Sequence, residues 1–155
     1  SAFEIADFQV RAFSVPHDAA DPVGFVISSD GARVGIATDL GHMNSLCIQR
    51  LKDCDALVLE SNHDVEMQKR SDRSPMLKRR NLGKLGHLSN DDAVGALGEL
   101  VTARTKIVFL VHLSSECNEC GIVSEAARKK LDDLGRKDVQ LVIVLQDKAS
   151  QTFWV

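Results

Sequence analysis

The side chains in this sequence that are best suited to chemistry are histidines and one aspartate at the ends of strand-like segments. Each directly follows such a segment or stands just before a helix start: His17, Asp39, His63, His87 and His112. In open α/β sheets, ligands gather at the carboxyl ends of strands. Imidazole and carboxylate groups that converge at such an edge suit a divalent metal ion such as zinc, manganese or iron. We therefore expect a metal site there.

Other candidate residues carry weaker signals. His42, beside Gly41, is expected to be a loop residue with satisfied hydrogen bonds. Asp39 could instead cap the helix that follows it. Cys117 and Cys120 form one Cys-x-x-Cys pair, whereas a structural zinc site needs a second ligand pair at suitable spacing. We interpret this pair as two thiols in a loop at a helix start.

Residues 69–84 are the most basic part of the chain. They contain seven basic residues and one acidic residue, a net charge of +6 in a chain whose formal net charge is −3. A solvated loop is one interpretation of this segment. The other is a phosphate-contacting surface, because lysine and arginine contacts to phosphates position a nucleic acid without reading its sequence. The candidate phosphate contacts are Lys78, Arg79 and Arg80.

The composition is that of a globular protein of one domain's length. The chain has 155 residues, of which 44% are hydrophobic and 26% charged, and a disordered chain would be poorer in apolar residues. No apolar run approaches the length needed to cross a bilayer, and the N-terminal residues lack the basic-then-apolar layout of a secretory signal. A chain this long can bury a core without disulfides, so we expect free thiols and a cytoplasmic protein.

Strands and helices alternate along the chain. The expected strands cover residues 8–16, 23–28, 33–37, 56–60, 106–111 and 139–145, with a last short one at 152–155. The expected helices cover residues 45–52, 89–102 and 123–134, and Gly135 ends the last of them. Ser29-Asp30-Gly31 is a hairpin turn signal, and residues 64–86 have the least regular pattern. Continuous apolar strands between helices predict an α/β fold in which helices cover a sheet.

Five short motifs, in this order, resemble those of the YycJ-like (WalJ-like) branch of the metallo-β-lactamase superfamily. They are HDAADPVGF at 17–25, TDLG at 38–41, ESNHD at 60–64, KRR at 78–80 leading to GHLSNDDA at 86–93, and VHLS at 111–114. The resemblance runs from about residue 3 to residue 114. It implies a fold in which metal ions lie between two facing sheets.

The resemblance also implies roles for individual residues. His17 looks like a ligand of a first metal ion and His112 like a ligand of a second, with Asp39 as the carboxylate that bridges both. His87 looks like the histidine that phosphodiesterase relatives such as RNase Z place near the scissile phosphate, and it is our candidate catalytic residue. Three further residues are expected to line the site or to orient its ligands: His63, Asp18 and Asp64.

The superfamily's His-x-His-x-Asp-His cluster is absent from this sequence. Because that cluster belongs to the N-terminal half of the fold, the chain resembles the C-terminal half of a metallo-β-lactamase αβ/βα sandwich. We expect one partial domain over residues 1–155, with a single mixed sheet and helices on one face. The other face would be a bare apolar surface of a kind seldom left in water. We expect it to pair with the missing N-terminal half or with a second copy in a homodimer.

The function implied by the resemblance is metal-dependent hydrolysis with two divalent ions in the intact form. A phosphodiester substrate and exonucleolytic action on DNA are favoured, because His87 stands in the motif Gly-His-x-Ser at 86–89. Alone, the chain would hold each ion through one histidine and the shared Asp39, so we expect weak activity or none. The alternatives are a non-enzymatic oligomerising half-domain and a hydrolase of esters, thioesters or lactams.

Overall fold

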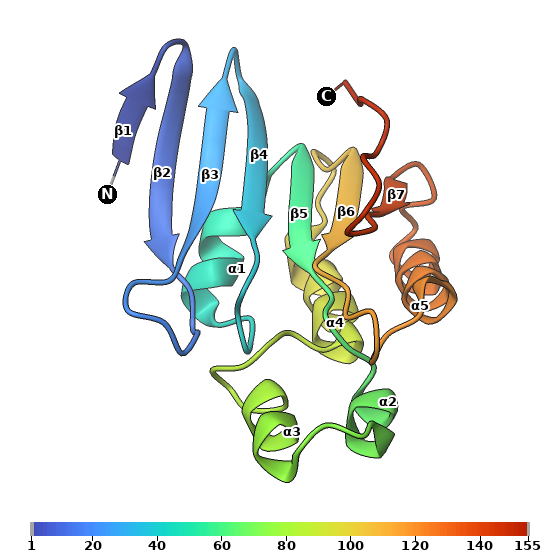
Figure 1. The fold of residues 1–155 in the computed structure, drawn as a ribbon. Helices are drawn as coiled ribbons and strands as arrows, with labels where there is room; N and C mark the ends of the chain where they lie inside the picture. Colours follow the sequence, from blue (N-terminus) through green and yellow to red (C-terminus); the bar gives the residue numbers. More distant parts are fainter. Residues whose placement is uncertain (1, 155) are drawn as a thin grey trace.

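The computed structural model describes residues 2–154, which form one seven-stranded sheet with helices packed on it (Figure 1). The strands are β1 (Ala2–Ile5), β2 (Phe8–Ser14), β3 (Val23–Ser29), β4 (Ala32–Ala37), β5 (Ala56–Glu60), β6 (Ile107–Val111) and β7 (Gln140–Ile143). The helices are α1 (Ser45–Leu51), α2 (Val65–Arg70), α3 (Pro75–Asn81), α4 (Asn90–Leu100) and α5 (Cys120–Asp133). The predicted α/β fold with a single mixed sheet is confirmed.

The strand order follows the sequence from β1 to β7, but the pairing changes halfway. Strands β1 to β4 pair antiparallel through short connections, whereas β4 to β7 pair parallel through connections that contain helices. As a result β2, β4, β5 and β6 all end at the same edge of the sheet, and α2 and α3 lie beyond that edge (Figure 1). The polar residues that follow these strands therefore meet.

The predicted hairpin turn between β3 and β4 is confirmed. Asp30 has a φ of +49° and Gly31 a φ of +82°. Two consecutive positive φ values are typical of the tight turn whose twist matches that of the flanking strands, and Gly adopts such a φ without a steric cost. This turn sets the register in which Ser29 pairs with Ala32.

The two faces of the sheet differ in what covers them. Helices α1, α4 and α5 pack on one face, where the row Val26, Gly35, Leu57 and Val108 meets the buried core (Figure 1). The cross-strand row on the opposite face is entirely apolar and half-buried: Phe25, Ile36, Val58, Phe109 and Val142. The face without helices is therefore apolar, as the sequence predicted.

Three sequence predictions of secondary structure were wrong. Residues 64–86 are not irregular but contain α2 and α3, which begin where the side chains of Asp64 and Ser74 accept hydrogen bonds from backbone N–H groups. Helices of six and seven residues are too short to show a helical repeat of apolar positions. The chain also has an edge strand, β1, that was not predicted.

The third wrong prediction concerns the C-terminal segment. Thr152–Trp154 form no strand, and Val155 lies outside the described residues. Phe153 packs edge-on against Phe109, with ring centroids 5.3 Å apart, so this segment lies over the face of the sheet rather than beside its edge strand. None of the helices in residues 2–154 is long and apolar enough to span a membrane.

Candidate metal centre

Four of the five polar residues predicted to gather at one edge of the sheet line a common cavity of about 690 Å³. His17 lies in the loop after β2, Asp39 follows β4 and His112 follows β6. His87, which precedes α4, lies between the two other histidines, with ring centroids 5.1 Å from His17 and 5.2 Å from His112. These four residues thus form one cluster, although they are up to 95 positions apart in the sequence.

Each of the three imidazole rings is held through Nδ1 by an oxygen atom. His17 Nδ1 lies 2.8 Å from the carbonyl oxygen of Gly86. His87 Nδ1 and His112 Nδ1 lie 2.7 Å and 2.9 Å from Oε1 of Glu60. Because carbonyl and carboxylate oxygens only accept hydrogen bonds, Nδ1 carries the proton in each neutral ring, and Nε2 keeps its lone pair. Metal-binding histidines are commonly held in this way.

Glu60 is the central residue that the sequence analysis missed. It is the last residue of β5, it is fully buried, and its Oε2 accepts a hydrogen bond from the backbone N–H of Leu40. Burial tends to raise the pKa of Glu60, but the hydrogen bonds from His112, His87 and Leu40 outweigh it and leave the pKa below its usual value. The hydrogen bond to Glu60 in turn raises the pKa of His112. The sequence did carry a signal for this role: Glu60 is the single charged residue of β5, and it stands at the strand's end, directly after four apolar residues.

Asp39 and His112 adopt unusual backbone conformations. Their φ values are +54° and +59°, in a region that residues other than glycine rarely occupy. Such strain is maintained only where the surrounding structure enforces it, and it is concentrated at functional sites. Oδ1 of Asp39 lies 3.9 Å from Nδ1 of His112 and 4.0 Å from Nδ1 of His87.

Two overlapping groups of side chains have ligand atoms within 4.8 Å of one another. One group is His17, Asp39 and His87, and the other is Glu60, His87 and His112. In the second group, Glu60 already accepts the Nδ1 protons of both rings, so we interpret it as a hydrogen-bonded support. The cavity thus offers Asp39 and three histidines whose Nδ1 atoms are already hydrogen-bonded. Such a set of donors fits a divalent metal ion.

Asp18 lies beside the cluster and is engaged by the basic segment. Nε and Nη2 of Arg80 donate hydrogen bonds of 2.5 and 2.8 Å to its two carboxylate oxygens, and its Oδ1 lies 3.6 Å from Nε2 of His17. The hydrogen bond from Arg80 is the main reason that the pKa of Asp18 is lowered. Arg80 therefore reaches the cavity, but its charge is partly neutralised.

His63 and Asp64 do not line the cavity, contrary to the expectation from the sequence. His63 is buried near enough to Glu60 and His87 to interact with their charges, and its own pKa is lowered, mainly by burial. Asp64 caps α2 by accepting a hydrogen bond from the backbone N–H of Met67. Both side chains are withdrawn because the chain turns into α2 directly after β5.

Of the three phosphate contacts predicted in the basic segment, only Arg80 lines the cavity in the described part of the chain. Lys78 donates a hydrogen bond to the carbonyl oxygen of Lys69, and Arg79 lines a separate surface hollow. Arg73, which was not singled out, lines the metal-site cavity together with Arg80, and its guanidinium contacts Ser114 and Glu116. Only the fold decides which of these charges reach the cavity.

The remaining candidates behave as their simpler interpretations suggested. Nδ1 of His42 is hydrogen-bonded to the carbonyl oxygen of Lys84. All four cysteines have free thiols, with Cys117 buried and Cys120 exposed at the first position of α5.

Comparison with known proteins identifies the family. The model of the β-lactamase superfamily domain matches residues 1–113 of the sequence. The chain belongs to the metallo-β-lactamase superfamily. It is 33% identical over 129 residues to the exodeoxyribonuclease YycJ of Bacillus anthracis, covering 83% of this chain and 49% of that protein. It is 35% identical over 112 residues to the exodeoxyribonuclease WalJ of Streptococcus pneumoniae D39, covering 72% of this chain and 42% of that protein.

Solved structures show the same fold. The metallo-β-lactamase fold protein YhfI from Bacillus subtilis matches with a TM-score of 0.67 and 14% identity, over 93% of this chain and 49% of that one. Zn²⁺-bound PqqB from Methylobacterium extorquens matches with a TM-score of 0.59 and 16% identity, over 93% and 47% of the respective chains. The chain therefore spans about half the length of these curated relatives and of these two solved structures.

Proposed function

We propose that this chain forms one half of a metal-dependent phosphodiesterase that acts as an exonuclease on DNA. The observation that carries the proposal is the cluster of three histidines whose Nδ1 atoms are all held by oxygen acceptors beside Asp39. The names of the YycJ and WalJ relatives support DNA as the substrate. Free thiols at all four cysteines support a reducing, cytoplasmic location.

The side chains at the cavity have separable roles in this proposal. His17, Asp39 and His112 would hold divalent metal, with zinc, manganese and iron as candidates and two ions in the completed site. Bound there, the metal would supply Lewis-acid polarisation of a phosphoryl oxygen. His87, fixed by Glu60, would protonate the leaving oxygen when its ring is charged. Arg73 and Arg80 would contact phosphates flanking the scissile bond.

The apolar face of the sheet would be covered by the N-terminal half of the same protein. A surface in which Ile36, Val58 and Phe109 form one continuous row is costly to leave in water. That half would add the ligands missing from each metal ion. If a second copy of this chain covered the face instead, the protein would sediment as a homodimer.

The decisive experiment measures 5′- and 3′-end-labelled DNA degradation by the protein completed with its N-terminal half, with and without added divalent metal. We expect metal-dependent release of mononucleotides, and a loss of about 100-fold or more in His87→Gln, since general acid catalysis contributes about 10²–10⁴-fold. His42→Gln is the matched control, because His42 lies outside the cavity. Hydrolysis of a lactam or thioester in place of DNA, or no tightly bound metal, would contradict the proposal.

A second experiment tests the DNA contacts. Arg73→Gln should weaken DNA binding and reduce the slope of affinity against salt concentration by about one, because one phosphate contact is lost. Arg79→Gln, on the same segment but outside the cavity, should change the slope less. Equal effects of the two substitutions would show that the segment acts only through its overall charge.

A further inference from the structure

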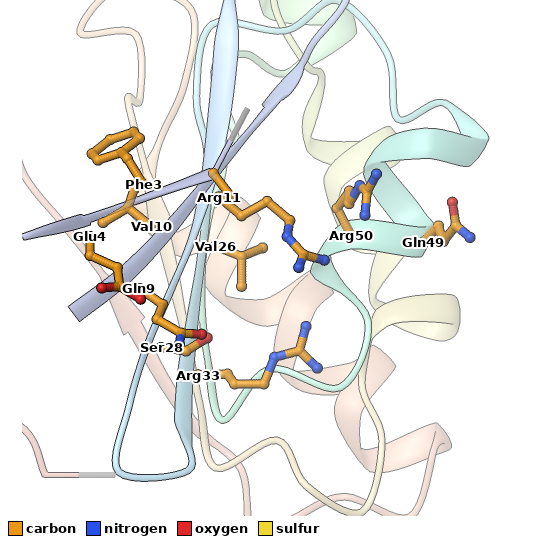
Figure 2. A pocket seen from close by; sticks show the side chains of 11 residues that line it. Phe3, Glu4, Gln9, Val10, Arg11, Val26, Ser28, Arg33, Gln49 and Arg50 are labelled. Atoms are coloured by element: carbon orange, nitrogen blue, oxygen red, sulfur yellow. The ribbon is translucent and has the colours of Figure 1, made fainter. Parts of the chain in front are cut away.

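A second cavity, of about 670 Å³, lies at the N-terminal end of the sheet, between strands β1 to β4 and helix α1. Figure 2 shows three arginine side chains that extend into it from three elements: Arg11 from β2, Arg33 from β4 and Arg50 from the last turn of α1. Arg33 stands near the start of β4, whereas Asp39 follows its end. The strand from Arg33 to Ala37 already spans four residues, or about 13 Å. The cavity is thus distinct from the metal centre.

These three arginines differ from the arginines that form ion pairs in the described residues. Arg80, Arg104 and Arg136 each form an ion pair with an aspartate. Within residues 2–154, the side chains of Arg11, Arg33 and Arg50 have neither a carboxylate partner nor a hydrogen-bond acceptor.

The wall of this cavity carries an excess of positive charge. Glu4 is its only acidic residue among those described, against three guanidinium groups. The Nε of Arg50 is buried without a hydrogen-bond partner among the described residues, although a buried donor that is left unpaired costs free energy. Convergent like charges and an unpaired buried donor are both relieved when a multiply charged anion binds between them.

We propose that this cavity binds the phosphate group of a small, nucleotide-sized phosphate ester. Guanidinium groups match phosphate oxygens in pairs, so three of them can surround one phosphate. On the face of the sheet that bears Arg11, the wall also includes the apolar side chain of Val26, which can contact the rest of such a ligand. A cavity of this volume suits a ligand enclosed by side chains, since ligand pockets commonly measure about 300–1,000 Å³. DNA bound at the metal centre would lie at the other end of the strands.

The test is calorimetric titration of the protein with inorganic phosphate and with deoxyadenosine 5′-monophosphate, in the presence of EDTA to remove metal from the other site. We expect saturable binding of both probes. Arg11→Gln and Arg50→Gln should each weaken it at least about tenfold, because a hydrogen bond to a charged group is lost. Glu4→Gln should tighten it, because the single negative charge of the wall is removed.

Two controls keep the result specific. Arg70→Gln, an exposed arginine on α2, should leave phosphate binding unchanged. Arg50→Lys retains the charge and should bind more tightly than Arg50→Gln, which separates a loss of binding from a loss of folding; circular dichroism checks the fold of each variant. Unchanged affinity in Arg11→Gln and Arg50→Gln would overturn the proposal. So would a loss of single-stranded DNA binding in these variants with mononucleotide binding intact.

Discussion

Strand β5 has a buried carboxylate at each end, and the two carboxylates are bonded by different types of side chain. Asp55, directly before the strand, is bonded by Nε and Nη2 of Arg104 at 2.9 and 2.6 Å and by the backbone N–H of Arg33. Glu60, the last residue of the strand, is bonded by the imidazole rings of His87 and His112. Both carboxyl groups have lowered pKa values, because their hydrogen bonds outweigh the opposing effect of burial.

The difference lies in what the partners leave available. Arginine is permanently charged and has no lone pair to offer, so the Asp55 end can only hold β4, β5 and the chain before β6 together. An imidazole that donates through Nδ1 still offers Nε2 to a ligand. The Glu60 end therefore combines a structural contact with a chemically available surface. The same strand supports the fold at one end and the candidate metal centre at the other.

The largest effect is expected from Glu60→Gln on metal binding. A glutamine offers one acceptor oxygen and an NH₂ donor, so it cannot accept from both imidazole rings and from Leu40 as Glu60 does. Loss of such a supporting contact costs about 10–100-fold in metal affinity, and we expect a loss in this range because the glutamine NH₂ must face either the Leu40 N–H or the two ring N–H groups. Competition with a chromophoric chelator measures the effect. Glu99→Gln on the exposed side of α4 is the control, and equal affinity in both variants would contradict the assigned role of Glu60.

Asp55→Asn should lower the free energy of unfolding by about 2 kcal/mol while metal affinity stays unchanged. Breaking a buried pair costs about 3–5 kcal/mol, and the value here is smaller because the Arg104 side chain is 39% exposed. Urea unfolding of the metal-free protein measures the change. If Asp55→Asn weakened metal binding as strongly as Glu60→Gln, the two ends of β5 would not be functionally separate.

The two ends should also differ in their dependence on pH, measured as the stability difference between wild type and variant without metal. Because the pKa of Glu60 is lowered from 4.5, its contribution is present above that pH and is lost in acid, as the pH falls through the folded-state pKa. Because the pKa of His112 is raised from 6.5, its contribution is present below that pH and is lost as the pH rises through the folded-state pKa. The difference for Glu60→Gln should therefore be greatest between about pH 4.5 and 6.5.

The Asp55→Asn difference should decline only in acid, because the pKa of Asp55 is lowered and its arginine partner does not titrate in this range. Buried His63 adds a separate loss of stability below its ordinary pKa of 6.5, since its pKa is lowered. That contribution is common to wild type and Asp55→Asn, whereas Glu60→Gln also removes the negative charge that partly offsets the lowering of the His63 pKa. A Glu60→Gln difference that stayed constant above pH 6.5 would show that His112 gains no proton from its contact with Glu60.

The smallest effect is expected from Arg104→Lys, at about 1 kcal/mol of unfolding free energy. Lysine keeps the charge but replaces the planar fork, which bonds Asp55 through two nitrogen atoms, with a single ammonium group. Thermal unfolding of this variant beside Asp55→Asn measures how much of the effect depends on geometry rather than charge. A loss equal to that of Asp55→Asn would mean that the charge of residue 104 contributes nothing.

Local sequence patterns predicted the strands that bear the site. Segment 56–60 has the predicted bounds, and the hairpin around Asp30 and Gly31 forms as its turn residues require. Such features depend on side chains that are neighbours in the sequence. Helices α2 and α3 were missed because they are too short to show an apolar repeat. Their clearest local signal is one capping side chain at the start of each.

The sequence by itself determined the residue types of the site and, through the rule that ligands gather at strand ends, the neighbourhood of His17, Asp39, His87 and His112. Only the tertiary structure decided that Glu60 supports two of these rings, that His63 is withdrawn and that Arg73 reaches the cavity. The physical reason is that a hydrogen bond depends on the distance and direction between two atoms. For residues 27 and 52 positions apart, those quantities exist only once the parallel strands have paired.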